Sequence, residues 1–398
     1  MTKPVRVALC ADYREEGWPS MDRVVDELLA ALKRHHSSVL DPKLICPTFR
    51  LRARRLSSHR LPMNIDRGLN RLIDYPRHVV SVAGDYDVFH VIDHSYAQLL
   101  HALPGDRTVV TCHDLDTFRS VFEPMAEPRS AAFRLMARYI LAGLRRAACV
   151  TCDTAAVRDE LVDRGLVAST RVVVAPIGVG DAFSADPDRA ADDDAGRLLQ
   201  APPGAIEVLH VGSTDPRKRL DVVLRSFAVL RRRLPRAHLV RVGGTLPTEY
   251  EDLVQELDLR HHISVLTDLD DRTLAAVYRR AAVAVLPSDR EGFGLPVAEA
   301  LRCGTPVVAR DIPVLREVGG SAAVYCDSEA PAVWADAILA VIRQRTEAPL
   351  QFAARRGGGV RWARRFTWSD FAERMTSIYA DIADRHLANT DRAEARPA

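Results

Sequence analysis

The chain has 398 residues, and its 55 Lys and Arg residues nearly balance its 53 Asp and Glu residues, for a formal net charge of +2. This balance gives no reason to expect bulk nucleic-acid binding. No apolar run is long enough for a transmembrane helix or a signal peptide, so we expect a soluble cytoplasmic protein. The length exceeds one ordinary hydrophobic core and fits two α/β domains with a cleft between them.

The first half alternates strands and helices, which is typical of a parallel sheet with crossover helices. Its apolar runs predict strands at 5–10, 88–92, 108–112, 149–151 and 172–175. An apolar stripe from Met21 to Leu32 at helical spacing predicts a helix with Ser20 as its N-cap. Cys149-Val-Thr-Cys152 has the spacing of a redox or zinc pair, but one pair cannot complete a four-ligand zinc site, so we favour simple packing of the thiols.

A stretch rich in Asp, Ala and Pro at 181–203 is predicted to be a linker between domains at 1–180 and 204–366. The pattern then restarts with apolar runs that predict strands at 207–211, 239–242, 263–266, 283–286 and 307–309. This indicates a second doubly wound parallel sheet. A final helix at 367–388, capped by Ser369 or Thr367, precedes a polar tail at 389–398 that we expect to be disordered.

The stretch from Leu286 to Ala309 reads as a buried strand, a glycine-bearing loop, a short helix, a turn and another buried strand. It places Glu291 and Glu299 around a helix N-terminus at the carboxyl end of a strand, where ligands bind in open parallel sheets. Because such N–H groups suit phosphate and acids suit sugar hydroxyls, we interpret it as half of a nucleotide-sugar site. Alternatively, acids simply favour helix N-termini by about 0.3 to 1 kcal/mol each, which explains Glu299 better than Glu291.

A second motif, Val211-Gly-Ser-Thr-Asp-Pro-Arg-Lys-Arg-Leu220, also follows a buried strand. Asp215 can N-cap a helix with Pro216 at its first position, which leaves the cations 217–219 in the first turn, where the helix dipole disfavours them. A bound diphosphate would resolve this conflict, since Arg, Lys and free N–H groups all bind phosphate. The alternative is a solvated basic helix end that pairs with surface carboxylates.

Together the two motifs resemble the GT-B glycosyltransferases of the large retaining GT4 family. The family signature of two glutamates separated by seven residues is met by Glu291-Gly-Phe-Gly-Leu-Pro-Val-Ala-Glu299, and its upstream Pro-Arg-Lys segment by Pro216-Arg-Lys218. The resemblance is specific over 204–330 and looser in the first domain. It implies two Rossmann-like domains that face a cleft, an N-terminal acceptor domain and a C-terminal donor domain, with the final helix returning to the first.

The same resemblance assigns roles to single residues. Arg217 and Lys218 would bind the donor diphosphate. Glu299 would bind the ribose hydroxyls and Glu291 the transferred sugar, while the backbone from Thr267 to Leu269 would border the base. The glycine-bearing segments would bring further contacts to the donor, namely Gly17, Gly212, Gly292, Phe293, Gly294 and Leu295.

His113 ends a predicted strand at the place where relatives carry a histidine that faces the donor sugar, so the resemblance implies a catalytic role. The alternative is a satisfied core histidine. Asp93 and His94 also end a strand, and turn chemistry explains them as well as acceptor binding does. The first loop departs from the family, because many relatives have paired glycines where this chain has only Gly17; the adjacent Trp18 fits either stacking on an acceptor or packing in the core.

An arginine-rich run from residue 50 to 77 contains few acids. We interpret it first as a solvated face, with an anionic-acceptor site and a membrane-surface patch as alternatives. Its members are Arg50, Arg52, Arg54, Arg55, Arg60, Arg67, Arg71 and Arg77.

The whole pattern predicts a hexosyltransferase that moves a sugar from a nucleotide-diphosphate sugar to a hydroxyl of a carbohydrate, lipid-linked or small-molecule acceptor. The cations and the helix N-terminus would stabilise charge on the leaving diphosphate, so no metal and no other cofactor is expected. The resemblance implies retention of the anomeric configuration through front-face attack.

Two alternatives stay open. A metal-dependent GT-A enzyme would need an Asp-x-Asp that ends a strand, whereas Asp85-Tyr-Asp87 precedes one and Asp268-Leu-Asp270 matches the base-side segment. A two-domain sugar-binding protein without catalysis would share the sheets and the cleft, but it would not need a cationic diphosphate site.

Overall fold

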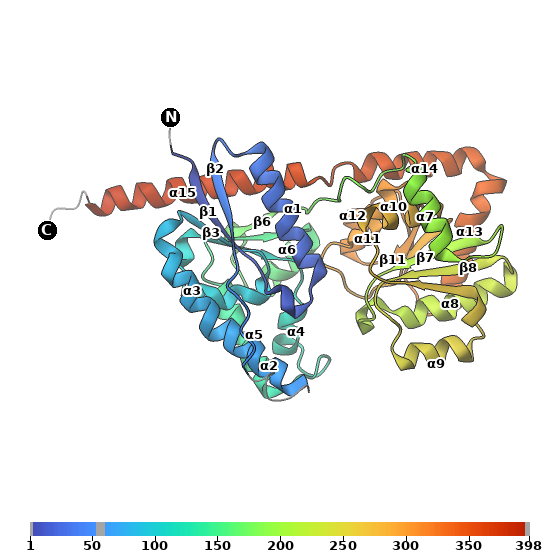
Figure 1. The fold of residues 1–398 in the computed structure, drawn as a ribbon, viewed down its shortest axis with the longest axis horizontal. Coiled ribbons are helices and arrows are strands. Elements are labelled where there is room, and N and C mark those ends of the chain that lie inside the picture. Colours follow the sequence, from blue (N-terminus) through green and yellow to red (C-terminus); the bar gives the residue numbers. More distant parts are fainter. Residues whose placement is uncertain (1–2, 53–59, 395–398) are drawn as a thin grey trace. The chain divides into compact units, whose positions relative to one another are not determined.

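The computed structural model describes residues 3–52 and 60–394. The chain forms two compact units (Figure 1): unit 1 comprises Met1–Gly178 and Trp368–Ala398, and unit 2 comprises Val179–Thr367. Each unit holds a six-stranded sheet flanked by helices, and all strand pairs are parallel. The predicted doubly wound α/β class is confirmed for both halves.

The sheet of unit 1 has the order β2-β1-β3-β4-β5-β6. Its strands are β1 (Val5–Cys10), β2 (Leu40–Ile45), β3 (Val88–Val91), β4 (Thr108–Cys112), β5 (Cys149–Cys152) and β6 (Val172–Val174). The sequence pattern missed β2, which carries an Asp, a Pro and a Lys. An edge strand tolerates these residues because one side of it is unpaired.

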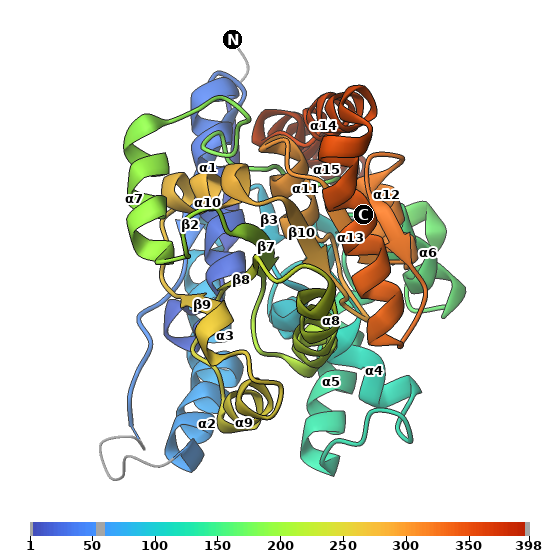
Figure 2. The ribbon, with the colours of Figure 1, turned by 90° about the vertical axis from the view of Figure 1, so that its right-hand side faces the viewer.

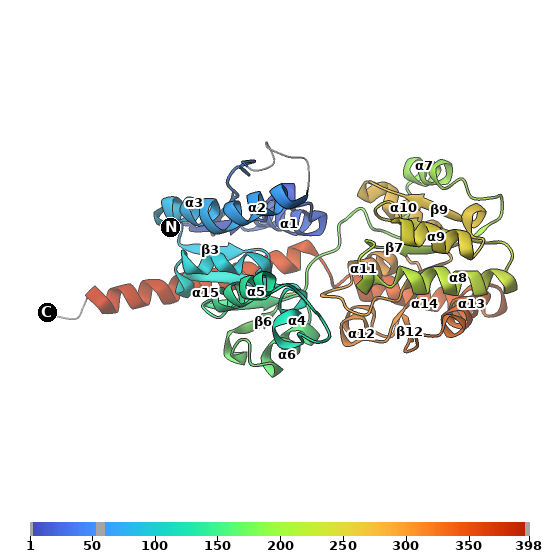
Figure 3. The same ribbon diagram turned by 90° about the horizontal axis from the view of Figure 1, so that it is seen from below.

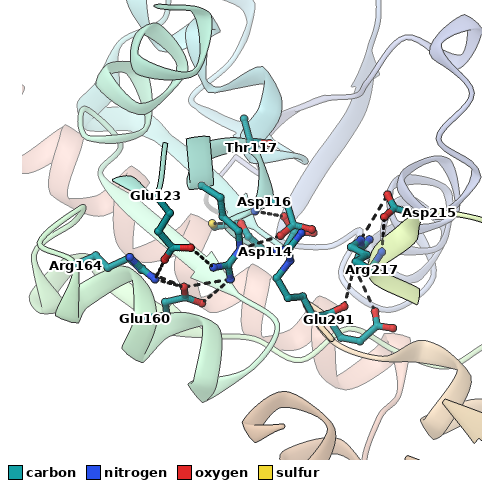
Figure 4. Close-up of polar contacts among 12 residues, drawn as sticks. Asp114, Asp116, Thr117, Glu123, Glu160, Arg164, Asp215, Arg217 and Glu291 are labelled. Carbon is teal, nitrogen blue, oxygen red and sulfur yellow. Dashed lines mark hydrogen bonds and ion pairs between the residues drawn. The ribbon is translucent and has the colours of Figure 1, made fainter. Parts of the chain in front are cut away.

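The helices of unit 1 are α1 (Pro19–His35), α2 (Arg60–Leu69), α3 (Tyr75–Val82), α4 (Asp116–Phe122), α5 (Ala131–Leu144), α6 (Ala155–Asp163) and α15 (Trp368–Glu394). The prediction that Ser20 caps the first helix is wrong, because Pro19 already occupies the first helical position and Trp18 is the N-cap residue. An ion-pair network in which Glu123 and Glu160 both contact Arg164 joins α4 to α6 (Figure 4).

The last helix, α15, packs on α1, β1 and β3 of unit 1 (Figure 3). The Tyr379 hydroxyl lies 2.6 Å from His90 Nδ1 in β3, so residues far apart in the sequence share one buried contact. The helix continues to Glu394, past the predicted end at 388. No Gly or Pro interrupts the sequence there, and residues 395–398 of the predicted tail lie outside the described residues.

The sheet of unit 2 has the order β12-β11-β10-β7-β8-β9. Its strands are β7 (Ile206–Val211), β8 (Ala237–Val242), β9 (Ile263–Leu266), β10 (Val283–Leu286), β11 (Val307–Arg310) and β12 (Val324–Cys326). The pattern missed β12, a strand of 3 residues at the edge of the sheet.

The helices of unit 2 are α7 (Arg189–Leu199), α8 (Leu220–Arg233), α9 (Thr248–Glu256), α10 (Asp271–Arg280), α11 (Leu295–Arg302), α12 (Pro313–Gly319), α13 (Pro331–Glu347) and α14 (Pro349–Ala363). One part of the core lies between the sheet and α8, α9 and α13, where Phe227, Leu239 and Trp334 are buried. Figure 2 shows α8 beside α13 and α7 beside α10.

The predicted linker at 181–203 contains α7, so it is more than a connection. Its acids pair with arginines of α10: Asp188 lies 2.7 Å from Arg272, and Asp192 lies 2.7 Å from Arg279. The acidic composition that suggested a linker therefore serves to hold a helix on unit 2. Within residues 3–52 and 60–394, none of the helices combines the length and apolar character needed to cross a bilayer.

Candidate functional site

The segment after β7 begins with a short turn rather than the first turn of α8. Asp215 caps a 3-10 helix, η7 (Pro216–Lys218), and its carboxylate accepts a hydrogen bond from the Arg217 N–H at 3.0 Å. Arg219 then adopts a left-handed conformation, with φ of 52°, before α8 begins at Leu220. The cap was predicted, but the placement of all three cations in one helical turn is wrong, because the left-handed residue separates the turn from α8.

Lys218 and Glu291 join the two sequence motifs. Lys218 Nζ lies 2.7 Å from both carboxylate oxygens of Glu291, and the Glu291 side chain is only 6% exposed. Arg217 Nη1 lies 3.7 Å from the same carboxylate and donates to the Arg290 carbonyl oxygen at 3.1 Å. Figure 4 shows the Arg217 guanidinium between the carboxylates of Asp215 and Glu291.

The charge of Glu291 follows from this pairing. Burial alone would raise the pKa of its carboxyl, but the positive charges of Lys218 and Arg217 outweigh burial and lower it. Glu291 is therefore a carboxylate near neutral pH, with two cations beside it. This arrangement can accept hydrogen bonds from hydroxyl groups and present positive charge to an anion.

The turn that follows Glu291 depends on a glycine. Gly294 has a φ of 86°, and a Cβ placed there would lie 2.6 Å from Leu315 Cδ2. The Phe293 ring is buried and packs edge-to-face against Phe366, with 5.2 Å between the ring centroids. Gly292 is buried too, and Leu295 begins α11, so the main chain reaches a helix N-terminus within four residues of the Glu291 carboxylate.

Glu299 lies in the middle of α11, buried, and its Oε2 accepts a hydrogen bond from the Tyr278 hydroxyl at 2.9 Å. No acidic residue occupies the first turn of α11. The alternative in which Glu299 merely favours a helix N-terminus is therefore wrong. Gly212 has no left-handed φ, and a Cβ there would make only van der Waals contacts, with His210 and Lys218.

The base-side segment follows β9. Thr267 and Leu269 are half-buried, and Asp268 is left-handed with φ of 54°. Asp270 caps α10 by accepting from the Thr273 N–H at 2.7 Å. In the other Asp-x-Asp sequence, Asp87 pairs with Arg6, so one acid of each has a structural partner. The described residues include no group of three His, Cys, Asp or Glu side chains that could hold a metal ion.

His113 is held on both sides within unit 1. Its Nδ1 lies 2.7 Å from Asp153 Oδ2 and its Nε2 lies 3.0 Å from the Ile92 carbonyl oxygen. Burial alone would lower its pKa, but the Asp153 carboxylate outweighs burial and raises the pKa to about 9. Because both nitrogens face acceptors, the ring is an imidazolium with both protons engaged. Its side chain is thus a satisfied buried group, as in the alternative interpretation.

The structure bears on two further first-domain predictions. Asp93 accepts from the Ser95 N–H at 3.1 Å, which is the turn chemistry offered for this segment. His94 is buried beside it, with Nε2 3.1 Å from Thr117 Oγ1. Trp18 is 53% exposed, so it does not pack in the core. Gly17, which precedes it, has a φ of 74° and open space around it.

The arginine-rich run is largely paired where the structure describes it. Arg52 contacts both oxygens of Asp74, at 2.7 and 2.8 Å. Arg71 Nε donates to the buried Glu16 carboxylate at 2.8 Å. The first interpretation, a solvated face, is wrong for Arg71, which pairs with a buried acid from outside the run. Arg52 is exposed, as that interpretation expects, and its acid Asp74 belongs to the same run. Arg54 and Arg55 lie outside the described residues, as does the side chain of Arg60.

Sequence reasoning missed two buried polar residues of the second sheet. His210 in β7 and Arg241 in β8 are 1% and 0% exposed. Register pairs them on neighbouring strands, near the carboxyl ends that lead to Gly212 and Gly243. Each of the mainly apolar runs Ile206–Val211 and Ala237–Val242 holds two polar residues, one of them near its carboxyl end, and this was the available signal.

Two family descriptions match the chain. "Glycosyl transferases group 1" matches residues 197–356, and "Glycosyltransferase Family 4" matches residues 21–183. The chain belongs to glycosyltransferase family 4. The two matches fall on the two sheets, and the first includes both Lys218 and Glu291.

Relatives with similar sequences carry the name D-inositol 3-phosphate glycosyltransferase. The protein of Thermobispora bispora is 32% identical over 249 residues, which cover 59% of this chain and 56% of the relative. The protein of Catenulispora acidiphila is 27% identical over 336 residues, covering 80% and 78%. This chain spans little more than half the length of the Thermobispora bispora protein.

Solved structures establish the fold. Sucrose-phosphate synthase from Thermosynechococcus elongatus superposes with a TM-score of 0.75 and 20% identity, over 95% of this chain and 99% of that one. Anabaena HepE in complex with UDP and glucose gives a TM-score of 0.72 and 15% identity, over 95% and 100%. Both units thus have the Rossmann-like folds of a GT-B glycosyltransferase, as predicted.

Proposed function

We propose that the protein transfers a sugar from a nucleotide-diphosphate sugar to an acceptor hydroxyl. The observation that carries this proposal is the contact of Lys218 with Glu291, at 2.7 Å to both oxygens, beside the N-terminus of α11. One side of this site is cationic and the other is an ionised carboxylate. A sugar diphosphate has the complementary pattern, with an anionic diphosphate next to sugar hydroxyls.

In the proposed reaction the bond between the anomeric carbon and the diphosphate oxygen breaks, and negative charge grows on the diphosphate. Lys218 and Arg217 stabilise that charge, and removal of one such contact is expected to slow the reaction by roughly 10²- to 10³-fold, as for other preorganised donors. Glu291 accepts hydrogen bonds from the transferred sugar. Glu299, oriented by Tyr278, accepts them from the ribose.

The proposed reaction retains the anomeric configuration and needs no metal. Both oxygens of Glu291 are engaged by Lys218, which makes this carboxylate a poor enzymic nucleophile. His113 is protonated on both nitrogens, so it cannot take the acceptor proton. These two features support attack from the face of the leaving diphosphate, whose oxygen takes that proton.

The names of the relatives suggest which compounds to test first. HepE binds UDP and glucose, so UDP sugars are the first donors, with GDP and ADP sugars beside them. The name D-inositol 3-phosphate glycosyltransferase makes D-inositol 3-phosphate the first acceptor. Carbohydrate and lipid-linked acceptors follow.

The decisive experiment measures thermal unfolding with UDP, GDP and ADP. A diphosphate at 100 times its dissociation constant adds about 2.7 kcal/mol of stability to the wild type. The variant Lys218→Met with Glu291→Gln removes both charges together, so neither is left buried alone, and it is expected to lose this gain. Arg225→Ala, on the exposed side of α8, is the matched control and keeps it.

Product analysis tests the remaining parts of the proposal. Transfer in the presence of EDTA and a retained anomer by NMR are the expected results. An inverted anomer would refute the retaining mechanism, and loss of transfer in EDTA would refute metal independence. Stabilisation by free sugars but by no nucleotide would instead favour a sugar-binding protein.

A further inference from the structure

Arg241 is a buried cation beneath the loop that follows β7. Arg241 is 0% exposed, and its Nη2 donates to the Gly212 carbonyl oxygen at 2.8 Å. Its Nε and Nη1 are also buried, and neither has a hydrogen-bond acceptor in the part of the chain that the structure describes. Two of the three guanidinium nitrogens are therefore left without a partner, which is costly for a charged group.

The charge of Arg241 is not neutralised by the fold. Across residues 3–52 and 60–394, no carboxylate lies within ion-pair distance of it, whereas Arg217 and Arg219 each have at least two. Burial lowers the pKa of Arg241, but a guanidinium stays protonated in proteins. A buried cation kept without a counter-ion indicates that an anion arrives with a ligand.

His210 adds a second unsatisfied group next to Arg241. Its Nδ1 lies 3.0 Å from the Val285 carbonyl oxygen, so Nδ1 carries the proton. Burial lowers its pKa to about 4, which keeps the ring neutral and leaves Nε2 as an acceptor with no donor among the described residues. This Nε2 lies 3.5 Å from the point that a Cβ of Gly212 would occupy.

Gly243 makes room for the guanidinium. It has a φ of 148°, and a Cβ there would lie 2.2 Å from Arg241 Nη1 and 2.0 Å from the Gly212 oxygen. Any other residue would displace Arg241 or the loop. The backbone at the ends of β7 and β8 is thus shaped around this cation.

We infer that Arg241 is a positioning residue for the donor diphosphate. Its hydrogen bond to the Gly212 carbonyl oxygen holds the loop of Gly212, Ser213 and Thr214, and its guanidinium gives that loop its positive charge. The three loop residues carry no cation, and Lys218 is already engaged by Glu291. Arg241 acts through the loop on the phosphates. This inference rests on the proposed function.

The test compares ligands that differ only in phosphate number. Uridine, UMP and UDP are titrated by calorimetry into the wild type, Arg241→Met, Arg241→Lys and the control Arg225→Met; if GDP or ADP is the diphosphate that stabilises the wild type, its series is used. We expect Arg241→Met to weaken diphosphate binding by roughly 10- to 100-fold, from the loss of a charged interaction. The loss should be smaller for the monophosphate and absent for the nucleoside. Arg241→Lys should keep most of the affinity.

A second readout separates this role from a structural one. Because Arg241→Met removes an unpaired buried charge, the ligand-free variant should melt at or above the wild-type temperature. Equal losses for nucleoside and diphosphate, or unchanged diphosphate binding, would overturn the inference. If Arg241→Met does not fold, Arg241→Gln is measured instead, because its side chain can still donate to Gly212. Wild-type diphosphate affinity in Arg241→Gln would then refute the role. A wild type that binds no diphosphate refutes the proposed function as well.

Discussion

Single buried side chains set the local charge distribution in both units, and the ion pair of Lys218 with Glu291 is an example. Each of these side chains is nearly buried, and each supplies the counter-charge of the other. Breaking such a pair on one side costs about 3 to 5 kcal/mol, whereas removing both charges costs far less. A donor that binds here must therefore share Lys218 with Glu291 rather than displace it.

His113 predicts a pH dependence of stability. Its pKa rises from an ordinary 6.5 to about 9 on folding, so the protonated ring stabilises the fold. This contribution is complete below pH 6.5 and is lost as the pH rises through 9. We expect urea unfolding to show a free energy that falls by on the order of 2 kcal/mol between pH 6.5 and 9.5.

The control for this prediction is His113→Asn. It removes the titrating group while keeping a side-chain donor, so the variant should have a flatter profile over the same pH range. His101→Asn, at a half-buried position of unit 1, is the matched substitution and should keep the wild-type profile. A slope that survives in His113→Asn would show that another group is responsible.

At the scale of elements, the turn between Glu291 and α11 is the most constrained part of the site. Gly294→Ala adds a Cβ 2.6 Å from Leu315 in a left-handed position, so we expect a loss of about 1 to 3 kcal/mol. The measurement is chemical unfolding together with diphosphate binding, which should weaken because α11 shifts. Gly244→Ala meets no atom within 4 Å and should cost little; equal effects would contradict this account.

The elements and the site differ in how far the sequence could predict them. Buried parallel strands such as β4 and β10 were predicted because they are continuous apolar runs. Family resemblance assigned Lys218 and Glu291 to one donor site, but the direct contact between their side chains was not predicted. The left-handed Arg219 and the two acceptors around His113 could not be predicted, because they depend on groups supplied by other strands and helices.

At the scale of the whole molecule, two separate units predict a localised response to the donor. Hydrogen exchange of the full chain should slow most around residues 212–219 and 291–295 of unit 2 when the stabilising diphosphate is added. The variant Lys218→Met with Glu291→Gln should show no such protection. Protection confined to the first sheet would contradict the placement of the donor site.

The place of α15 has a consequence for biosynthesis. Unit 2 is a continuous segment, but unit 1 needs residues from both ends of the described chain. The His90 ring cannot contact Tyr379 until that residue, 289 positions later in the chain, has been synthesised. At roughly 5 to 20 residues per second, the half-built first unit stands on the ribosome for about 15 to 60 seconds with its helix-binding face uncovered. The unit that is started first is thus finished last, and chaperones would meet it before its partner helix does.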